Sequence, residues 1–223
     1  MLKIYPRAIE SAVRAFKDHK AAYRVSTGFS VLDWKRPGTI QYWVRMVFDH
    51  ERNNTMAVYI TGDLGEAVVY PTCPASLEDM ANCFTSREPG GPIDINETYF
   101  LEKVKTGNHL FEWGMDEFKE DLREEFVRRF GKDEDQHELN EFFEEYCDGY
   151  LPNVVIDNGV HITDSFARDA LESIFPDWNE WIYSCGKRVS NFVVFWLVAM
   201  RLAYEQLNEP GERKANDGEE QQA

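Results

Sequence analysis

Nine consecutive apolar residues at positions 192–200 constrain the fold of this chain more than any other feature. A helix that crosses a bilayer needs about 20 apolar residues, so the run is too short for a membrane span. A helix that is apolar on every side packs at the centre of a globular protein. We therefore expect a buried helix over residues 190–207, in a protein that does not associate with membranes.

The N-terminal half predicts one helix followed by a small antiparallel sheet. Residues 6–21 carry apolar side chains three and four positions apart, which is typical of a helix with one buried face. Segments rich in β-branched and aromatic residues come next, separated by short polar turns, and they predict an antiparallel meander. Its four strands are expected at residues 29–34, 39–49, 55–61 and 66–70.

The remainder of the chain predicts mostly helices. They are expected at residues 76–84, 96–105, 116–129, 134–147, 164–175 and 190–207, with Ser76 and either Thr163 or Asp164 as N-caps. Residues 208–223 hold no large apolar residue and are expected to form a disordered acidic tail. The fold class is therefore α+β: a small antiparallel sheet with an N-terminal helix, then a mostly helical C-terminal half, in one domain over residues 1–207.

Negative charge is concentrated in one stretch of the sequence. The chain has 24 Lys and Arg against 40 Asp and Glu, a formal charge of −16. Residues 1–50 carry nine Lys and Arg against four acids, whereas residues 112–145 carry five against fourteen. Because such an acidic chain repels phosphates, we expect no direct binding of nucleic acid.

Two interpretations of the acidic stretch stay open. Its carboxylates either form solvated helix faces that keep the protein soluble, or form a surface that binds a basic partner. A helix repeats side chains every ~5.4 Å along its axis, close to the phosphate spacing of a nucleic acid. Arg123, Arg128 and Arg129 interrupt the surface. The candidate partner-binding residues are Glu117, Glu120, Asp121, Glu124, Glu125, Glu134, Asp135, Glu138, Glu141 and Glu145.

Two further clusters have both a structural and a functional interpretation. Asp63 lies within a Gly-Asp-Leu-Gly turn and Glu66 directly follows it. The two acids either present carboxylates to a ligand or simply follow glycines that a tight hairpin needs. Trp178 and Trp181 lie in a short polar stretch after Pro176. They either pack on the core or form an exposed anchor for a partner.

The sequence contains no recognisable catalytic or metal-binding motif. No two of the five histidines or four cysteines have the spacing of a zinc site, and no nucleophile elbow is present. We therefore expect no catalytic residue, metal or cofactor, and four reduced structural cysteines. The first residues lack the pattern of a signal peptide, so we expect the cytoplasm, of a host cell if a phage encodes the chain.

Three segments together resemble a group of small bacteriophage-encoded proteins of uncharacterised function. They are residues 60–68 with the Gly-Asp-Leu-Gly hairpin, residues 99–103 with a Tyr-Phe-x-x-Lys pattern, and the Trp-containing segment 195–207. The resemblance spans roughly residues 40–207 and implies a phage origin. It implies no catalytic residue.

These features lead to three hypotheses about function. The first is a phage accessory protein, similar to an anti-CRISPR protein, that binds and inhibits a basic host protein that handles nucleic acids. The second is a small ligand-binding protein or enzyme with a pocket between sheet and helices, using Asp63, Glu66 and Glu102. The third is an assembly component, such as a homodimer, that self-associates through the Trp178 and Trp181 region.

Overall fold

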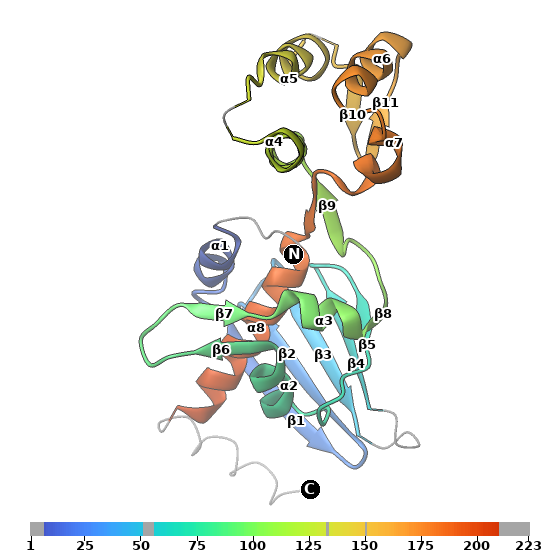
Figure 1. Ribbon diagram of the computed structural model, residues 1–223. Helices are drawn as coiled ribbons and strands as arrows, with labels where there is room; N and C mark the ends of the chain where they lie inside the picture. The colour runs from blue at the N-terminus through green and yellow to red at the C-terminus, as the bar shows by residue number, and fades with distance from the viewer. Residues whose placement is uncertain (1–6, 51–55, 133, 150, 210–223) are drawn as a thin grey trace, which may run out of the picture. The chain divides into compact units, whose positions relative to one another are not determined.

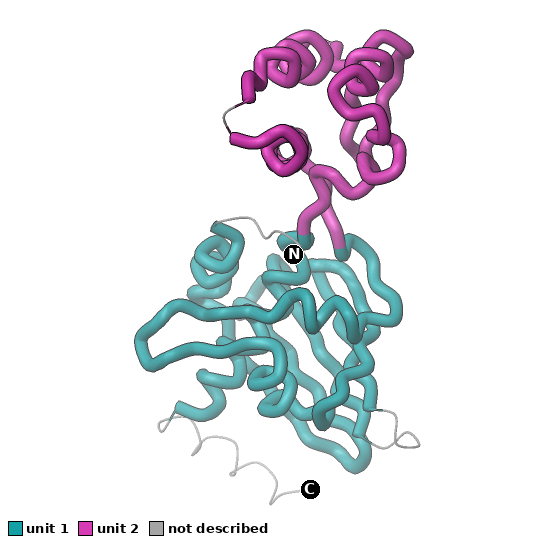
Figure 2. Tube along the Cα trace, in the orientation of Figure 1, with its two compact units in different colours: residues 1, 3–110, 189–223 teal, residues 2, 111–188 magenta. Residues whose placement is uncertain are grey.

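The computed structural model describes residues 7–50, 56–132, 134–149 and 151–209, and these residues form two compact units (Figure 2). Unit 1 holds the chain up to Leu110 and again from Val189 onward, whereas unit 2 is Phe111–Arg188. We expected one domain over residues 1–207, and that expectation did not include a division into two compact units. Each unit buries its own apolar side chains, which is the physical basis of two separate compact units.

Unit 1 is built on a six-stranded antiparallel sheet with the order β1-β2-β3-β4-β5-β8 (Figure 1). Its strands are β1 (Lys20–Ser26), β2 (Phe29–Lys35), β3 (Val44–Asp49), β4 (Ala57–Gly62), β5 (Ala67–Val69) and β8 (Val104–Gly107). Its other elements are α1 (Ala8–Ala15), α2 (Leu77–Phe84), the hairpin β6 (Thr85–Arg87) and β7 (Ile93–Ile95), α3 (Glu97–Lys103) and α8 (Asn191–Asn208).

One face of this sheet forms the core of unit 1 together with α8. Alternate residues of β2, β3 and β4 point to the same side, because side chains alternate along a strand. Those on the core side are Leu32, Trp34, Val44, Met46, Phe48, Val58 and Ile60, all at most 2% exposed. Phe16 connects the layers, with its ring 5.9 Å from Trp34 and 5.4 Å from Phe195 of α8. Every residue of α8 from Val193 to Met200 is buried, which confirms the buried helix.

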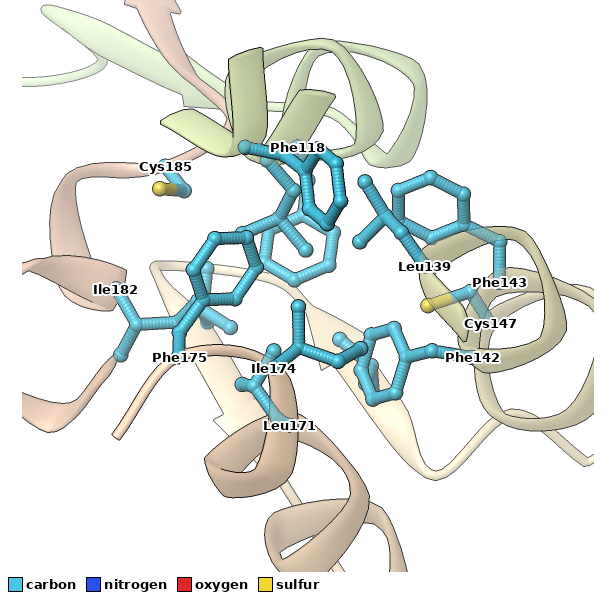
Figure 3. Close-up of a cluster of buried hydrophobic side chains, with 14 residues drawn as sticks. Phe118, Leu139, Phe142, Phe143, Cys147, Leu171, Ile174, Phe175, Ile182 and Cys185 are labelled. Atoms are coloured by element: carbon cyan, nitrogen blue, oxygen red, sulfur yellow. The ribbon is translucent and has the colours of Figure 1, made fainter. Parts of the chain in front are cut away.

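Unit 2 is mainly helical and has a separate core. It contains β9 (Phe111–Trp113), α4 (Met115–Phe130), α5 (His137–Phe142), a π-helix η1 (Phe143–Cys147), the hairpin β10 (Val154–Ile156) and β11 (Val160–Ile162), α6 (Ser165–Ile174), α7 (Trp178–Trp181), a 3₁₀ turn η2 (Ile182–Ser184) and β12 (Lys187–Val189). Figure 3 shows its core, in which Phe118 of α4, Phe142 of α5 and Phe175 after α6 converge. Strands β9 and β12 pair, so the two ends of the insertion lie together.

The α+β fold class is confirmed, and so are several local details. Ser76 caps α2 by accepting a hydrogen bond from Asp79 N–H, and Asp164 caps α6 in the same way through Ala167 N–H. The expected helices at 116–129 and 190–207 are α4 and α8 to within one residue. Local capping and periodicity determined these elements.

Other elements differ from expectation because their secondary structure depends on contacts with residues distant in sequence. The first helix was predicted to reach residue 21 but ends at Ala15, and Lys20–Ser26 instead pairs along β2. The sheet has six strands rather than four, since β1 and β8 extend it at its two edges. Residues 134–147 form the short α5 and then a π-helix, rather than one helix. Asn208 belongs to α8, and residues 210–223 of the expected tail lie outside the described residues.

Candidate functional site

Helix α4 has one apolar stripe and two acidic rows. Phe118, Leu122 and Phe126 lie four residues apart and are buried in the core of unit 2 (Figure 3). The acids Asp116 and Glu117 lie in the first turn of α4, where the helix dipole favours negative charge. The acidic residues of α4 form two rows. The inner row lies beside the apolar stripe, and the outer row is exposed to solvent.

The inner row consists of Glu117, Asp121 and Glu125, which hold unit 2 together. Glu117 forms an ion pair with Arg188. Asp121 Oδ2 accepts a hydrogen bond of 2.7 Å from Gly186 N–H. Glu125 pairs with Arg128, at 2.7 Å from its Nε, and with Arg129. These three expected partner-binding residues are therefore engaged within the protein itself.

Arg129 links α4 to the segment that follows α6. It pairs with Glu125 and with Asp177, and its guanidinium lies 5.6 Å from the Phe175 ring and 5.3 Å from the Trp181 ring. Hydrogen bonding to arginine lowers the pKa of Glu125, through Arg128 first, and the pKa of Asp177, through Arg129. Both carboxylates are thus held in the ionised form.

The exposed carboxylates lie on the outer row of α4, at residues 134 and 135 before α5, on α5 and on η1. The expected residues that are exposed are Glu120, Glu124, Glu134, Asp135, Glu138, Glu141 and Glu145; Asp116 and Glu144 join them. His137 lies among them, with Asp135 accepting from its N–H at 3.0 Å and Glu141 3.2 Å from its Nε2.

Two cations of α4 make contacts within unit 2. Lys119 pairs with Asp148, and Arg123 lies 4.6 Å from the centre of the Phe143 ring. Unit 2 as a whole has 8 Lys and Arg against 21 Asp and Glu, which is −13 of the formal −16. The acidic stretch of the sequence, residues 112–145, therefore begins at the start of unit 2 and lies entirely within that unit.

Asp63 has a structural position at the β4–β5 hairpin. Its Oδ2 accepts from Tyr42 N–H at 2.8 Å, and its own N–H donates to Trp43 O at 2.9 Å. Glu66 is exposed, and its N–H donates to Asn108 Oδ1 at 2.9 Å. Glu102 is exposed on α3. The turn and its supports account for Asp63 without a ligand.

Trp178 and Trp181 pack against the core of unit 2, both of them half-buried. The Trp181 ring lies 5.3 Å from the Phe175 ring, edge to face. Nearby Tyr183 is 65% exposed. Core packing is therefore the role that the contacts of both tryptophans support.

A cavity of about 460 Å³ in unit 1 contains residues that the sequence did not single out as a site. Phe16, His19 and Trp34 line it. Its charged lining consists of Arg14, Lys17, Arg87, Glu205 and Glu209, with Arg87 paired to Glu205 at 2.8 Å. His19 is 3% exposed, and the buried Trp34 indole nitrogen has no hydrogen-bond partner. Such orphaned buried groups are uncommon.

Burial is the main influence on His19 and lowers the pKa of its imidazole. Arg36 lowers it further, whereas the backbone of Gln41 and Tyr42 and the carboxylate of Asp18 act in the opposite direction. His19 is therefore neutral at pH 7. An isolated histidine at the end of a predicted helix gave no local signal for this burial, since the contacting strand and helix are remote in sequence.

The four cysteines are free thiols, and burial is the main cause that raises the pKa of both Cys73 and Cys147 to about 12. Hydrogen bonding to Cys83 adds to the shift at Cys73. Among the described residues, no three or more His, Cys, Asp and Glu side chains gather in a group that could hold a metal ion.

Neither the helices of the described residues nor similarity to known proteins indicates a protein family for the chain. None of the helices within the described residues combines the length and apolar character of a membrane span. Comparison with protein-family models, curated proteins and solved structures finds no match, so only the chain's own residues bear on its function.

Proposed function

We propose that this chain is a phage-encoded accessory protein that binds and inhibits a basic host protein involved in nucleic-acid handling or defence, in the manner of an anti-CRISPR protein. The acidic surface of unit 2, defined by the exposed carboxylates of α4, α5 and η1, is the binding surface. The observation that carries the proposal is the charge of −13 in unit 2, together with the exposure of carboxylates on α4, α5 and η1.

The spacing of the exposed acids supports a binding role. Glu138 and Glu141 are three residues apart, and Glu141 and Glu145 are four apart, so they are neighbours on the helical surface. Like charges at these spacings destabilise a helix. A cationic partner would remove that repulsion, and it would be attracted over a long range at low salt.

The π-helix in the same segment also supports it. Phe143–Cys147 forms this π-helix directly after α5, with Glu144 and Glu145 both exposed. π-helical turns are rare and occur frequently at functional sites, where they change the direction in which side chains point.

Charge reversal with a matched control tests the proposal. The binding variant changes Glu138, Glu141, Glu144 and Glu145 to Lys, all exposed in unit 2. The control variant changes Glu66, Glu88, Asp94 and Glu102 to Lys, all exposed in unit 1, and alters the net charge equally.

We expect the wild-type protein to retain a basic protein from bacterial lysate at about 0.05 M salt and to release it at about 0.5 M. The control variant should retain the same protein, and the binding variant should not. The purified partner should then lose its own activity when the wild-type protein is added. Equal retention by both variants, or no retained basic protein, would reject the proposal.

A second candidate function is the binding of a small planar anion in the His19 cavity, within unit 1. It is favoured by the Trp34 indole nitrogen, which has no hydrogen-bond partner, and by Arg14 and Lys17 in the lining. Arg87 pairs with Glu205, and Glu209 also lines the cavity, so Arg14 and Lys17 are the cations that an anion would contact. A panel of small aromatic carboxylates should raise the melting temperature if this is a ligand site. Trp34→Phe keeps an aromatic ring but removes the indole N–H, and should reduce that increase. No shift across the panel would count against this candidate.

A further inference from the structure

Three sulfur-containing side chains converge in unit 1 at α2. Cys73 precedes the helix, whereas Met80 and Cys83 lie on it three residues apart, and so on one side. The distance from Cys73 Sγ to Met80 Sδ is 4.0 Å. The Cys83 thiol lies within hydrogen-bonding reach of Cys73. The fold thus brings together three sulfur atoms from residues that span ten positions of the sequence, from Cys73 to Cys83.

The access to this cluster is suited to a small ion. Cys73 and Cys83 are half-buried, whereas the other two cysteines, Cys147 and Cys185, are buried. Met80 is fully buried, and its sulfur faces the Cys73 thiol. The cluster therefore has a half-buried side formed by the two cysteines and a buried inner side formed by a thioether.

The distance between Cys73 Sγ and Met80 Sδ fits one edge of a metal site with three sulfur ligands. Metal–sulfur bonds are about 2.3 Å long. An ion at the centre of a triangle with such bonds places its ligand atoms about 4.0 Å apart, which is the separation of Cys73 Sγ and Met80 Sδ. Thiolate and thioether ligands together select monovalent copper. We propose that Cys73, Met80 and Cys83 form a binding site for Cu(I), a function separate from binding of a basic partner.

Binding of the ion requires no electron transfer. Two copper–thiolate bonds form as the S–H bonds of Cys73 and Cys83 break, and two protons pass to solvent. Met80 donates a sulfur lone pair and releases no proton. Copper remains monovalent, both cysteine sulfurs remain reduced, and the filled cluster has a charge of −1.

Zinc fits this cluster poorly. A structural zinc ion takes four ligands in a tetrahedron, from Cys, His or carboxylate groups. In the described part of the chain no group of three or more such side chains occurs, here or elsewhere. The thioether of Met80 supplies a ligand that favours copper over zinc.

Titration of the full-length, reduced protein under anaerobic conditions tests the site. Cu(I) is delivered from bicinchoninate, whose coloured complex reports the free ion. We expect one Cu(I) per chain. Loss of a thiolate ligand, which also carries the negative charge that holds the cation, should exceed the effect of about 10- to 100-fold that changes beside metal ligands produce. Cys73→Ser and Cys83→Ser should each therefore weaken binding by about 100-fold or more.

Two methionine variants give a matched comparison. Met80→Leu should weaken binding about tenfold. Met56→Leu should leave it unchanged, because the Met56 sulfur already accepts from Ala75 N–H at 3.2 Å. Since Met80 belongs to the core, X-ray absorption of the copper-loaded wild-type protein provides a second measurement, with three sulfur neighbours expected at about 2.3 Å.

Several results would overturn the copper site. They are a wild-type protein that takes no Cu(I) from bicinchoninate, cysteine variants that bind as the wild type does, nitrogen or oxygen neighbours in place of sulfur, and tighter binding of Zn²⁺ than of Cu(I). A Cys73–Cys83 disulfide formed on exposure to copper would also overturn it, and is detected as a mass loss of two hydrogens.

Discussion

Gly62 and His19 show how single residues in unit 1 depend on distant contacts. Gly62 ends β4 with a φ of +138°, and a Cβ there would lie 2.2 Å from the carbonyl oxygen of Trp43, the residue directly before β3. His19 is a neutral imidazole enclosed by Phe16 and Trp34, at ring distances of 4.9 and 5.8 Å. Each position has a consequence for stability that can be measured.

Gly62→Ala should destabilise the protein by about 3 kcal/mol, since it combines an unfavourable φ with a backbone clash. Gly38→Ala is the matched control, because Gly38 also has a positive φ, +79°, but no atom lies within 4 Å of a Cβ there. The control should cost about 1 kcal/mol, from backbone conformation alone. Urea denaturation measures both. Similar losses for the two variants would contradict the clash.

Acidification should destabilise the protein through His19. Its folded pKa lies below the unfolded value of 6.5, so the unfolded chain binds the proton more readily. This contribution is absent well above pH 6.5, and it lowers the free energy of unfolding as pH falls below 6.5, by at most about 1.4 kcal/mol per pH unit. Urea denaturation from pH 8 to pH 5 measures it.

His19→Phe should remove that component of the pH dependence. His161→Phe changes an exposed histidine of unit 2 and should leave the dependence as it is in the wild type. An unchanged slope in His19→Phe would show that other groups cause the loss of stability at low pH.

At the scale of elements, α4 shows how one helix serves both packing and charge. Its apolar stripe builds the core of unit 2, and its inner acids pair with groups remote in sequence, such as Arg188 and the Gly186 N–H. Its last turn carries two arginines with different roles. Arg129 is 21% exposed and contacts two aromatic rings, whereas Arg128 is 69% exposed and pairs with Glu125.

Arg129→Ala should destabilise unit 2 by about 1 kcal/mol or more, because it removes cation–π contacts and leaves Asp177 without its arginine. Arg128→Ala should leave the denaturation midpoint almost unchanged, since exposed ion pairs contribute little. Urea denaturation of both variants, followed by tryptophan fluorescence, measures the difference. Equal effects would show that the contacts of Arg129 with Phe175 and Trp181 contribute nothing.

At the scale of the whole molecule, unit 2 is an insertion whose ends are close together. Ser190 N–H donates to Leu110 O at 3.0 Å in unit 1, and β9 pairs with β12 in the inserted segment. The insertion carries −13 of the charge, so the remainder of the chain has a formal charge of −3.

Replacement of residues 111–188 by about four Gly and Ser residues should leave unit 1 folded, because its sheet and α8 core contain no residue of the insertion. The shortened chain should unfold cooperatively in urea and should no longer retain a basic partner. Loss of cooperative unfolding would show that unit 1 requires unit 2 for its stability.

The sequence by itself determined the elements whose causes are local. The N-cap Ser76, the periodic stripe of α4 and the apolar run of α8 each depend on residues a few positions apart, and all were predicted. The cap of α6 was narrowed to Thr163 or Asp164, and the structure selects Asp164. The acidic stretch was also visible, since composition alone defines it.

Only the tertiary structure decided what depends on distant pairs. Lys20 and Ala21 became part of a strand because β2 lies beside them, although their local pattern had favoured a helix. Which carboxylates are paired was decided by cations far along the chain, as Arg188 shows for Glu117. The burial of His19 and the approach of Cys73 to Met80 have the same origin. Long-range contacts bring together groups whose separation in sequence leaves no periodic or capping signal.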